Sequence, residues 1–285
     1  MNWTDRRRKF RAILKGERCY HPASVFDPLS ARIAQDLGFE VGMFAGSTAS
    51  LTVLGAPDLI LLTLSEFAAQ AYRINSAFEV PLLVDADHGY GNALNVMRTV
   101  RELETAGVSA LTIEDTALPR GYGAGAGGLI SIEEGAAKMR AALAARQDPD
   151  LVIVGRTIAM GLTSTEDAIA RAKAYAAAGV DAFFFVGMQT RAQLEAAAAA
   201  IDIPIIIGGG AELTDLDYLG SKRVRVALQG HQPIMAAAQA VHDTLKALRD
   251  GVKPKDLTGV PSAAFMAKAT RDADYQRWTN EFLGG

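Results

Sequence analysis

Eight short apolar runs recur along the chain, and they constrain the fold more than any other feature. Most are continuously apolar instead of alternating, which is the pattern of strands buried on both faces in a parallel sheet. Helical stretches separate them and supply the crossovers that parallel strands need. We expect strands at Cys19–Ala23, Val41–Ala45, Leu82–Asp85, Ala110–Glu114, Leu151–Arg156, Ala182–Val186, Ile203–Gly208 and Val224–Leu228.

Helix start and stop signals fit between these runs. Capping patterns open the helical stretches, and glycines such as Gly179 follow them. Eight units are the number that closes a (β/α)8 TIM barrel, and a doubly wound open sheet is the alternative. We therefore predict an α/β fold in which 1–285 is a single barrel domain. Its C-terminal extension comprises a helix at Pro233–Leu248 and a helical tail over 251–285. The expected N-caps are Thr63, Asn92, Ser131, Thr163 and Thr190.

Charge and cysteine content exclude several functional classes. The formal net charge is −3 with both signs interspersed, so nucleic-acid binding is not expected. The Arg6–Lys9 run is interpreted as a solvated helix face. No apolar run approaches the roughly 20 residues of a membrane span. The single cysteine, Cys19, is expected in the core and favours a reducing, cytoplasmic compartment.

Polar residues at the ends of three successive strands form the candidate site. Asp85 and Asp87 end the third strand, Glu114 the fourth and Arg156 the fifth. Catalytic groups of such barrels lie at these strand ends. Carboxylates gathered there repel one another unless a hard cation lies between them, and Mg²⁺ prefers oxygen ligands. We predict a Mg²⁺ site at this rim. Arg156 either pairs with the acids or, as we favour, clamps a substrate carboxylate.

Two further strand ends carry candidate substrate-binding groups. Gly46, Ser47 and Thr48 follow the second strand and offer backbone N–H and hydroxyl groups to an anion. His231 follows the eighth strand as a hydrogen-bond donor or proton relay, whereas His21 and His88 are weaker candidates. The glycine-rich segment 119–128 is interpreted as a mobile lid.

Five short motifs recur at the expected strand ends and loops. They are Gly46-Ser47, Pro57-Asp58, Asp85-x-Asp87-x-Gly89-x-Gly91-Asn92, Ile113-Glu114-Asp115 and Gly155-Arg156. Together they resemble the isocitrate lyase/phosphoenolpyruvate mutase superfamily over nearly the whole chain. The resemblance implies a Mg²⁺-dependent barrel, usually a homotetramer built as a dimer of dimers, with the helix after strand eight swapped between protomers.

The resemblance also implies roles at the matching positions. Asp87 is similar to the direct metal ligand, and Asp85 and Glu114 to ligands that act through water. Asp58 is similar to a loop carboxylate near the site and is a candidate catalytic residue. Ser47, with its neighbouring amides, and Arg156 resemble the cradle for the substrate carboxylate. Mn²⁺ is a candidate replacement for Mg²⁺.

Departures in the gate loop narrow the expected activity. Carbon–carbon lyases of the superfamily carry a Cys there, whereas this chain has Arg120-Gly121-Tyr122-Gly123. The Lys and Asn of the mutase gate are also absent. The glycine-rich gate and His231 most resemble the oxaloacetate decarboxylase branch.

We therefore expect Mg²⁺-dependent decarboxylation of oxaloacetate, a small 2-oxo-carboxylate, to pyruvate and CO₂ through an enolate that the ion stabilises. Arg156, His231 and Asp58 are the candidate catalytic residues. One alternative is a Mg²⁺-dependent lyase acting on a substituted malate or related 2-hydroxy diacid. A second is a non-catalytic 2-oxo-acid-binding protein. A sugar-phosphate barrel would need a phosphate clamp and a strand-end Lys, and neither is evident.

Overall fold

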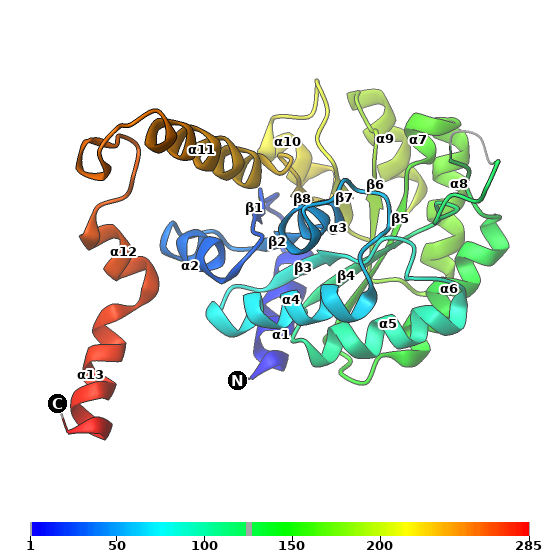
Figure 1. The fold of residues 1–285 in the computed structure, drawn as a ribbon. Helices are drawn as coiled ribbons and strands as arrows, with labels where there is room; N and C mark the ends of the chain where they lie inside the picture. Colours follow the sequence, from blue (N-terminus) through cyan, green and yellow to red (C-terminus); the bar gives the residue numbers. More distant parts are fainter. Residues whose placement is uncertain (1, 124–126, 285) are drawn as a thin grey trace.

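Eight parallel strands pair in chain order, and helices surround them (Figure 1). The computed structural model describes residues 2–123 and 127–284. A parallel bridge between Tyr20 and Val226 joins the segment before β1 to β8 and closes the ring. The predicted (β/α)8 barrel is confirmed. The strands are β1 (Ala23–Ser24), β2 (Gly42–Phe44), β3 (Leu82–Asp85), β4 (Ala110–Glu114), β5 (Val152–Thr157), β6 (Ala182–Phe185), β7 (Ile205–Ile207) and β8 (Val224–Ala227).

The first strand is shorter and later than predicted. We expect Cys19–Ala23 from the sequence, but β1 covers Ala23–Ser24 and Tyr20 forms only an isolated bridge. Pro22 lies inside the expected run and has no N–H to donate to a ladder, so it interrupts the pairing. The other predicted runs overlap their strands.

Alternate strand residues face two different cores. At one set of alternate strand positions, here called the inner-face parity, residues such as Met43, Leu83 and Val154 fill the barrel interior together with Phe10. Residues of the other parity, such as Phe44, pack between the strands and the surrounding helices. Because side chains alternate along a strand, this parity fixes which strand-end side chains face the mouth of the barrel.

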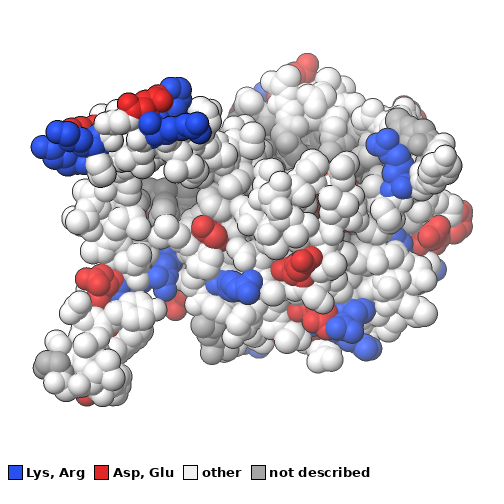
Figure 2. Space-filling model, viewed as in Figure 1, with Lys and Arg blue, Asp and Glu red and all other residues white. Residues whose placement is uncertain are grey.

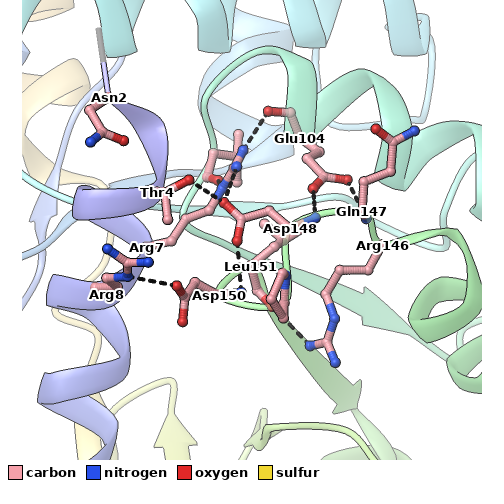
Figure 3. Close-up of polar contacts among 12 residues, drawn as sticks. Asn2, Thr4, Arg7, Arg8, Glu104, Arg146, Gln147, Asp148, Asp150 and Leu151 are labelled. Atoms are coloured by element: carbon pink, nitrogen blue, oxygen red, sulfur yellow. Dashed lines mark hydrogen bonds and ion pairs between the residues drawn. The ribbon is translucent and has the colours of Figure 1, made fainter.

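Helix α1 (Trp3–Lys15) closes the opposite, N-terminal mouth. In Figure 3, Arg7 contacts Asp148 at 2.7 Å and donates to the Glu104 carbonyl, while Arg8 contacts Asp150 at 2.9 Å. The solvated-face interpretation of Arg6–Lys9 is therefore wrong for Arg6 and Arg7, which are buried. Each finds carbonyl acceptors beneath the barrel, which offsets the loss of hydration. This end of a barrel serves stability.

Four of the five predicted N-caps begin a helix. Thr63, Asn92, Ser131 and Thr190 are N-caps. Thr163 is not, because Ser164 caps α8 and the Thr163 hydroxyl donates to Asp167 instead. The helical segments between the strands are α2 (Pro28–Asp36), α3 (Gly46–Ala49), the π-helix η1 (Ser50–Leu54), α4 (Leu64–Ala77), α5 (Ala93–Thr105), α6 (Ile132–Ala145), α7 (Ala159–Leu162), α8 (Thr165–Ala178), α9 (Arg191–Ala200) and α10 (Leu216–Ser221).

The C-terminal segments extend away from the barrel (Figure 1). Helix α11 (Gln232–Arg249) buries none of its residues. The 3₁₀ turn η2 (Pro254–Asp256), α12 (Ala263–Thr270) and α13 (Asp272–Leu283) follow, and an ion pair of Arg271 with Asp36 ties them to α2. Lys and Arg side chains lie among Asp and Glu side chains on the face shown in Figure 2. Within the described ranges, no helix is both long and apolar enough to cross a membrane.

Candidate active site

A cavity of about 720 Å³ lies at the C-terminal ends of the strands and gathers most of the candidate residues. Asp85, Glu114 and Arg156 share the inner-face parity of the barrel, so the strands themselves direct these side chains into the cavity. Asp87 joins them from the turn after β3. The lining is Met43, Ser47, Asp58, Leu59, Ile60, Asp85, Asp87, Glu114, Leu118, Pro119, Arg120, Arg156, Phe184, Val186, Gly208, Leu228, Gly230 and His231.

Arg156 pairs with the acidic cluster. Its Nη1 lies 2.5 Å from both carboxylate oxygens of Asp85 and 3.2 Å from Oε2 of Glu114. Arg156 thus forms the ion pairs that were one of its two predicted roles, and its clamping of a substrate carboxylate stays a prediction. The Arg156 Nε is enclosed and has no partner among the described residues, and no hydrogen bond joins Nη2 to them. Nη2 is therefore the nitrogen of this guanidinium that remains for a substrate anion.

The turn after β3 places Asp87 beside Gly46. Asp87 has a left-handed backbone with φ of 48°, which Asp tolerates better than most residues. The Glu114 N–H donates to the Asp87 carbonyl at 2.9 Å and holds this turn against β4. A Cβ atom on Gly46 would lie 2.7 Å from either carboxylate oxygen of Asp87. Gly46 thus acts by leaving room for this carboxylate.

Asp85 is oriented by its own hydrogen bonds. The Thr112 hydroxyl donates to its Oδ1 at 3.0 Å, and the Asp87 N–H donates to the same oxygen at 3.2 Å. With the Arg156 contact, these bonds fix the carboxylate at the rim.

Burial and mutual repulsion disfavour the charged carboxylates. Burial raises the pKa of Asp87 well above its usual value, and the charges of Asp85 and Glu114 raise it further. Burial likewise raises the pKa of Glu114, and burial followed by the Asp85 charge raises that of Asp58. A divalent cation would reverse these effects, and an all-oxygen donor set suits Mg²⁺.

The side-chain arrangement fits a largely hydrated ion. Across residues 2–123 and 127–284, no three His, Cys, Asp or Glu side chains are grouped to bind one ion together. Mg²⁺ keeps several waters and needs only one or two carboxylates, so a site with Asp87 as the direct ligand does not require such a group. The residues present therefore fit a Mg²⁺ ion that keeps most of its waters and has Asp87 as its direct protein ligand.

The segment after β2 supplies part of the predicted anion cradle. Ser47 lines the cavity, and Gly46 and Ser47 open α3, where N–H groups lack intrahelical partners. Thr48 does not reach the cavity. Its buried hydroxyl donates to the Ala45 carbonyl at 2.8 Å and accepts from the Ala45 N–H, so it shapes the turn.

His231 lines the cavity, and its Nδ1 lies 2.8 Å from the Ser24 hydroxyl. Burial lowers its pKa, which favours the neutral ring. The His21 Nδ1–H instead donates to the Ala227 carbonyl, and His88 is buried outside the lining. Cys19 is buried as expected, and burial raises its pKa to about 12.

The gate segment is described in part. Pro119 and Arg120 line the cavity, and a bridge between Thr116 and Leu129 pairs the two ends of the loop. Residues 124–126 of the predicted 119–128 lid lie outside the described residues.

Phe184 and Ser24 were not among the predicted site residues. The Phe184 ring lies 5.5 Å from the Arg156 Cζ and forms an apolar wall of the cavity. Its inner-face parity on β6 is the signal that would have identified it. Ser24 carried no comparable signal, because its importance depends on closure of the ring beside β8.

Comparisons with known proteins agree with the family resemblance and with the fold. The phosphoenolpyruvate phosphomutase family model matches residues 10–249. An oxaloacetate decarboxylase of Rhodopseudomonas palustris (strain BisB18) is 60% identical over 285 residues, covering 100% of this chain and 99% of that protein. A phosphonopyruvate hydrolase solved with oxalate and Mg²⁺ is similar at a TM-score of 0.85 and 28% identity, covering 98% and 99% of the two chains. An oxaloacetate acetylhydrolase solved with the inhibitor 3,3-difluorooxalacetate is similar at a TM-score of 0.86 and 27% identity. The match covers 99% of this chain and 98% of that chain.

Proposed function

The chain belongs to the phosphoenolpyruvate phosphomutase family, and from this premise we propose that its strand-end cavity decarboxylates oxaloacetate to pyruvate and CO₂ with the help of Mg²⁺. The chain is a carbon–carbon lyase of the superfamily that its motifs resemble. One observation carries the proposal: a single cavity is lined by four carboxylates together with Arg156 and His231. Identity of 60% over the full length to an oxaloacetate decarboxylase supports the choice of substrate.

We propose that Asp87 holds the ion directly and that Asp85 and Glu114 hold it through water. The phosphonopyruvate hydrolase neighbour, solved with Mg²⁺, supports the choice of metal. When bound, Mg²⁺ supplies a Lewis acid that withdraws electron density from the 2-oxo group. Mn²⁺ is expected to substitute, because it also prefers oxygen ligands.

Ser47 and Arg156 are proposed to hold the C1 carboxylate of the substrate. Ser47 offers a hydroxyl and a backbone N–H at the start of α3, and Arg156 offers Nη2, which its ion pairs through Nη1 leave unused. Fixing this end orients the bond between C3 and C4 for cleavage. That bond breaks with its electron pair passing towards C2 and the 2-oxo oxygen, so CO₂ leaves and no protein base is needed.

His231 and Asp58 are proposed to serve the opposite end of the substrate. The neutral His231 ring contacts the C4 carboxylate before it departs. Asp58 lines the same cavity, and its carboxyl is proposed to deliver the proton that C3 receives to give pyruvate. Phe184 and Leu59 provide apolar surface that limits access of water.

We further propose a homotetramer in which the extension with the 251–285 tail packs on other copies. Exposed apolar residues support this role, because Val241, Leu245 and Leu248 follow helical spacing on α11, and Trp278 and Phe282 do so on α13. Light scattering coupled to size exclusion tests the assembly, and a monomer at micromolar concentration would reject it.

The single cysteine supports a cytoplasmic location.

Product analysis over a panel of C4 and C5 oxo- and hydroxy-diacids tests the function. Stoichiometric pyruvate and CO₂ from oxaloacetate, abolished by EDTA and restored by Mg²⁺, are expected. Cleavage of a substituted malate in preference to oxaloacetate would support the alternative lyase. Thermal stabilisation by these acids without turnover of any would support a binding protein.

A further inference from the structure

Ser24 and His231 meet because the barrel closes on itself. Ser24 ends β1, and His231 follows β8 immediately before α11. The bridge between Tyr20 and Val226 sets these two strands side by side, and the Ser24 Oγ then lies 2.8 Å from the His231 Nδ1. Ser24 is largely buried, and its small exposed part borders a second cavity that it lines together with Phe26 and Gln232.

The surroundings decide which group donates in this hydrogen bond. Among the described residues, the Ser24 hydroxyl has no hydrogen-bond partner other than Nδ1. If the ring carried its proton on Nδ1, the hydroxyl hydrogen would have no acceptor there, and a buried donor without a partner is destabilising. Donation from Ser24 to Nδ1 satisfies both groups and leaves the ring proton on Nε2.

The charges around the ring favour the same tautomer. Asp58 and Asp85 are the carboxylates that act on His231, and Arg156 is the opposing cation. Carboxylates attract an N–H and repel a nitrogen lone pair. Ser24 is not part of the cavity lining and His231 is, so the nitrogen left for the cavity is Nε2. The ring therefore presents a donor to the cavity.

We infer that Ser24 is a positioning residue that holds His231 as the neutral Nε2–H tautomer, so that Nε2 donates a hydrogen bond to a second carboxylate on the substrate. The substrate class that follows is a 2-oxo diacid whose distal carboxylate lies at His231. The role in turnover rests on the proposed function, whereas the tautomer does not.

Nitrogen NMR of the histidine rings tests the tautomer directly. The chain has four histidines, so loss of one signal set in His231→Asn assigns the residue. In the full-length protein with Mg²⁺ at pH 7.5, we expect a protonated Nε2 and an unprotonated Nδ1. Ser24→Ala should mix the two tautomers, and Ser24→Thr, which keeps the hydroxyl, should restore the single form. A protonated Nδ1 in the wild type, or an unchanged ring in Ser24→Ala, overturns the inference.

Kinetics with oxaloacetate test the positioning role. Ser24→Ala should lower kcat about tenfold, the equivalent of one neutral hydrogen bond, with KM changed less than about twofold. Ser24→Thr should recover most of kcat, and equal losses in both variants would indicate a packing defect and reject positioning. If the wild type shows the expected tautomer but does not decarboxylate oxaloacetate, the proposed function fails and the tautomer assignment stands.

Discussion

Substitution of Gly46 by Ala tests whether the position of the Asp87 carboxylate controls the reaction. The added Cβ would lie 2.7 Å from both carboxylate oxygens, about 0.7 Å short of ordinary van der Waals contact. Gly46 does not have a positive φ, so the backbone accepts Ala and the effect is confined to this contact. Either Asp87 or the α3 segment must move, and both are packed against strand ends.

The expected loss follows from that displacement. A misplacement of about 1 Å at a reacting centre lowers rates by roughly 100-fold, so about 0.7 Å should lower kcat/KM for oxaloacetate by roughly 10- to 100-fold. The Mg²⁺ concentration for half-maximal activity should rise as well, because Asp87 is the proposed direct ligand. Steady-state assays across a Mg²⁺ series measure both quantities.

Two controls isolate the contact. Gly16→Ala places a Cβ at the end of α1 with ordinary 3.4 Å contacts, and it should retain wild-type kinetics. In an Asp87→Ala background the overlap at Gly46 disappears. Gly46→Ala should therefore lower the free energy of unfolding much less in that background than in the wild type. Wild-type kcat/KM and Mg²⁺ dependence in Gly46→Ala would refute the reasoning.

Three further predictions concern buried side chains. Burial raises the pKa of Cys19 to about 12, so iodoacetamide at pH 8 should leave the folded protein unmodified and fully active, and inactivation through Cys19 would contradict its place in the core. Burial and then Lys138 lower the pKa of His88 to about 4, so the unfolded state binds more protons below pH 6.5. The free energy of unfolding in urea should fall by about 2 kcal/mol between pH 6.5 and 5, and the decrease should be absent in His88→Gln, whereas equal decreases in both proteins would reject this assignment. The Lys138 ammonium donates to the His88 carbonyl at 2.9 Å beside Asp87, so Lys138→Met should raise the Mg²⁺ concentration for half-maximal activity about tenfold, and an unchanged value would show that this bond does not support the metal site.

The barrel and its acidic rim were predictable because strand periodicity determines both. Continuous apolar runs mark buried parallel strands, and the residues that end them necessarily meet at one mouth. Asp85, Glu114 and Arg156 therefore needed no tertiary information to be grouped. The first strand was misplaced because Pro22 removes a donor from an otherwise convincing run.

Contacts between side chains distant in the sequence were less predictable. Arg156 was predicted either to pair with the acids or to clamp a substrate carboxylate, and only the tertiary structure shows its ion pairs with Asp85 and Glu114. Thr48 looked like an anion ligand, yet its hydroxyl serves its own turn. The bond between Ser24 and His231 depends on closure of the ring, which strand order alone does not fix to within a hydrogen-bond length.

Manganese binding measured by electron paramagnetic resonance tests the central claim most directly. Metal-free wild type and Asp87→Ala are titrated with Mn²⁺, and oxaloacetate turnover is recorded in the same samples. We predict that the wild type binds a single ion per chain and gains activity in proportion. We predict no saturable binding and no metal-dependent turnover for Asp87→Ala. A variant that binds Mn²⁺ with wild-type affinity, or decarboxylates oxaloacetate at the wild-type rate, would contradict the account.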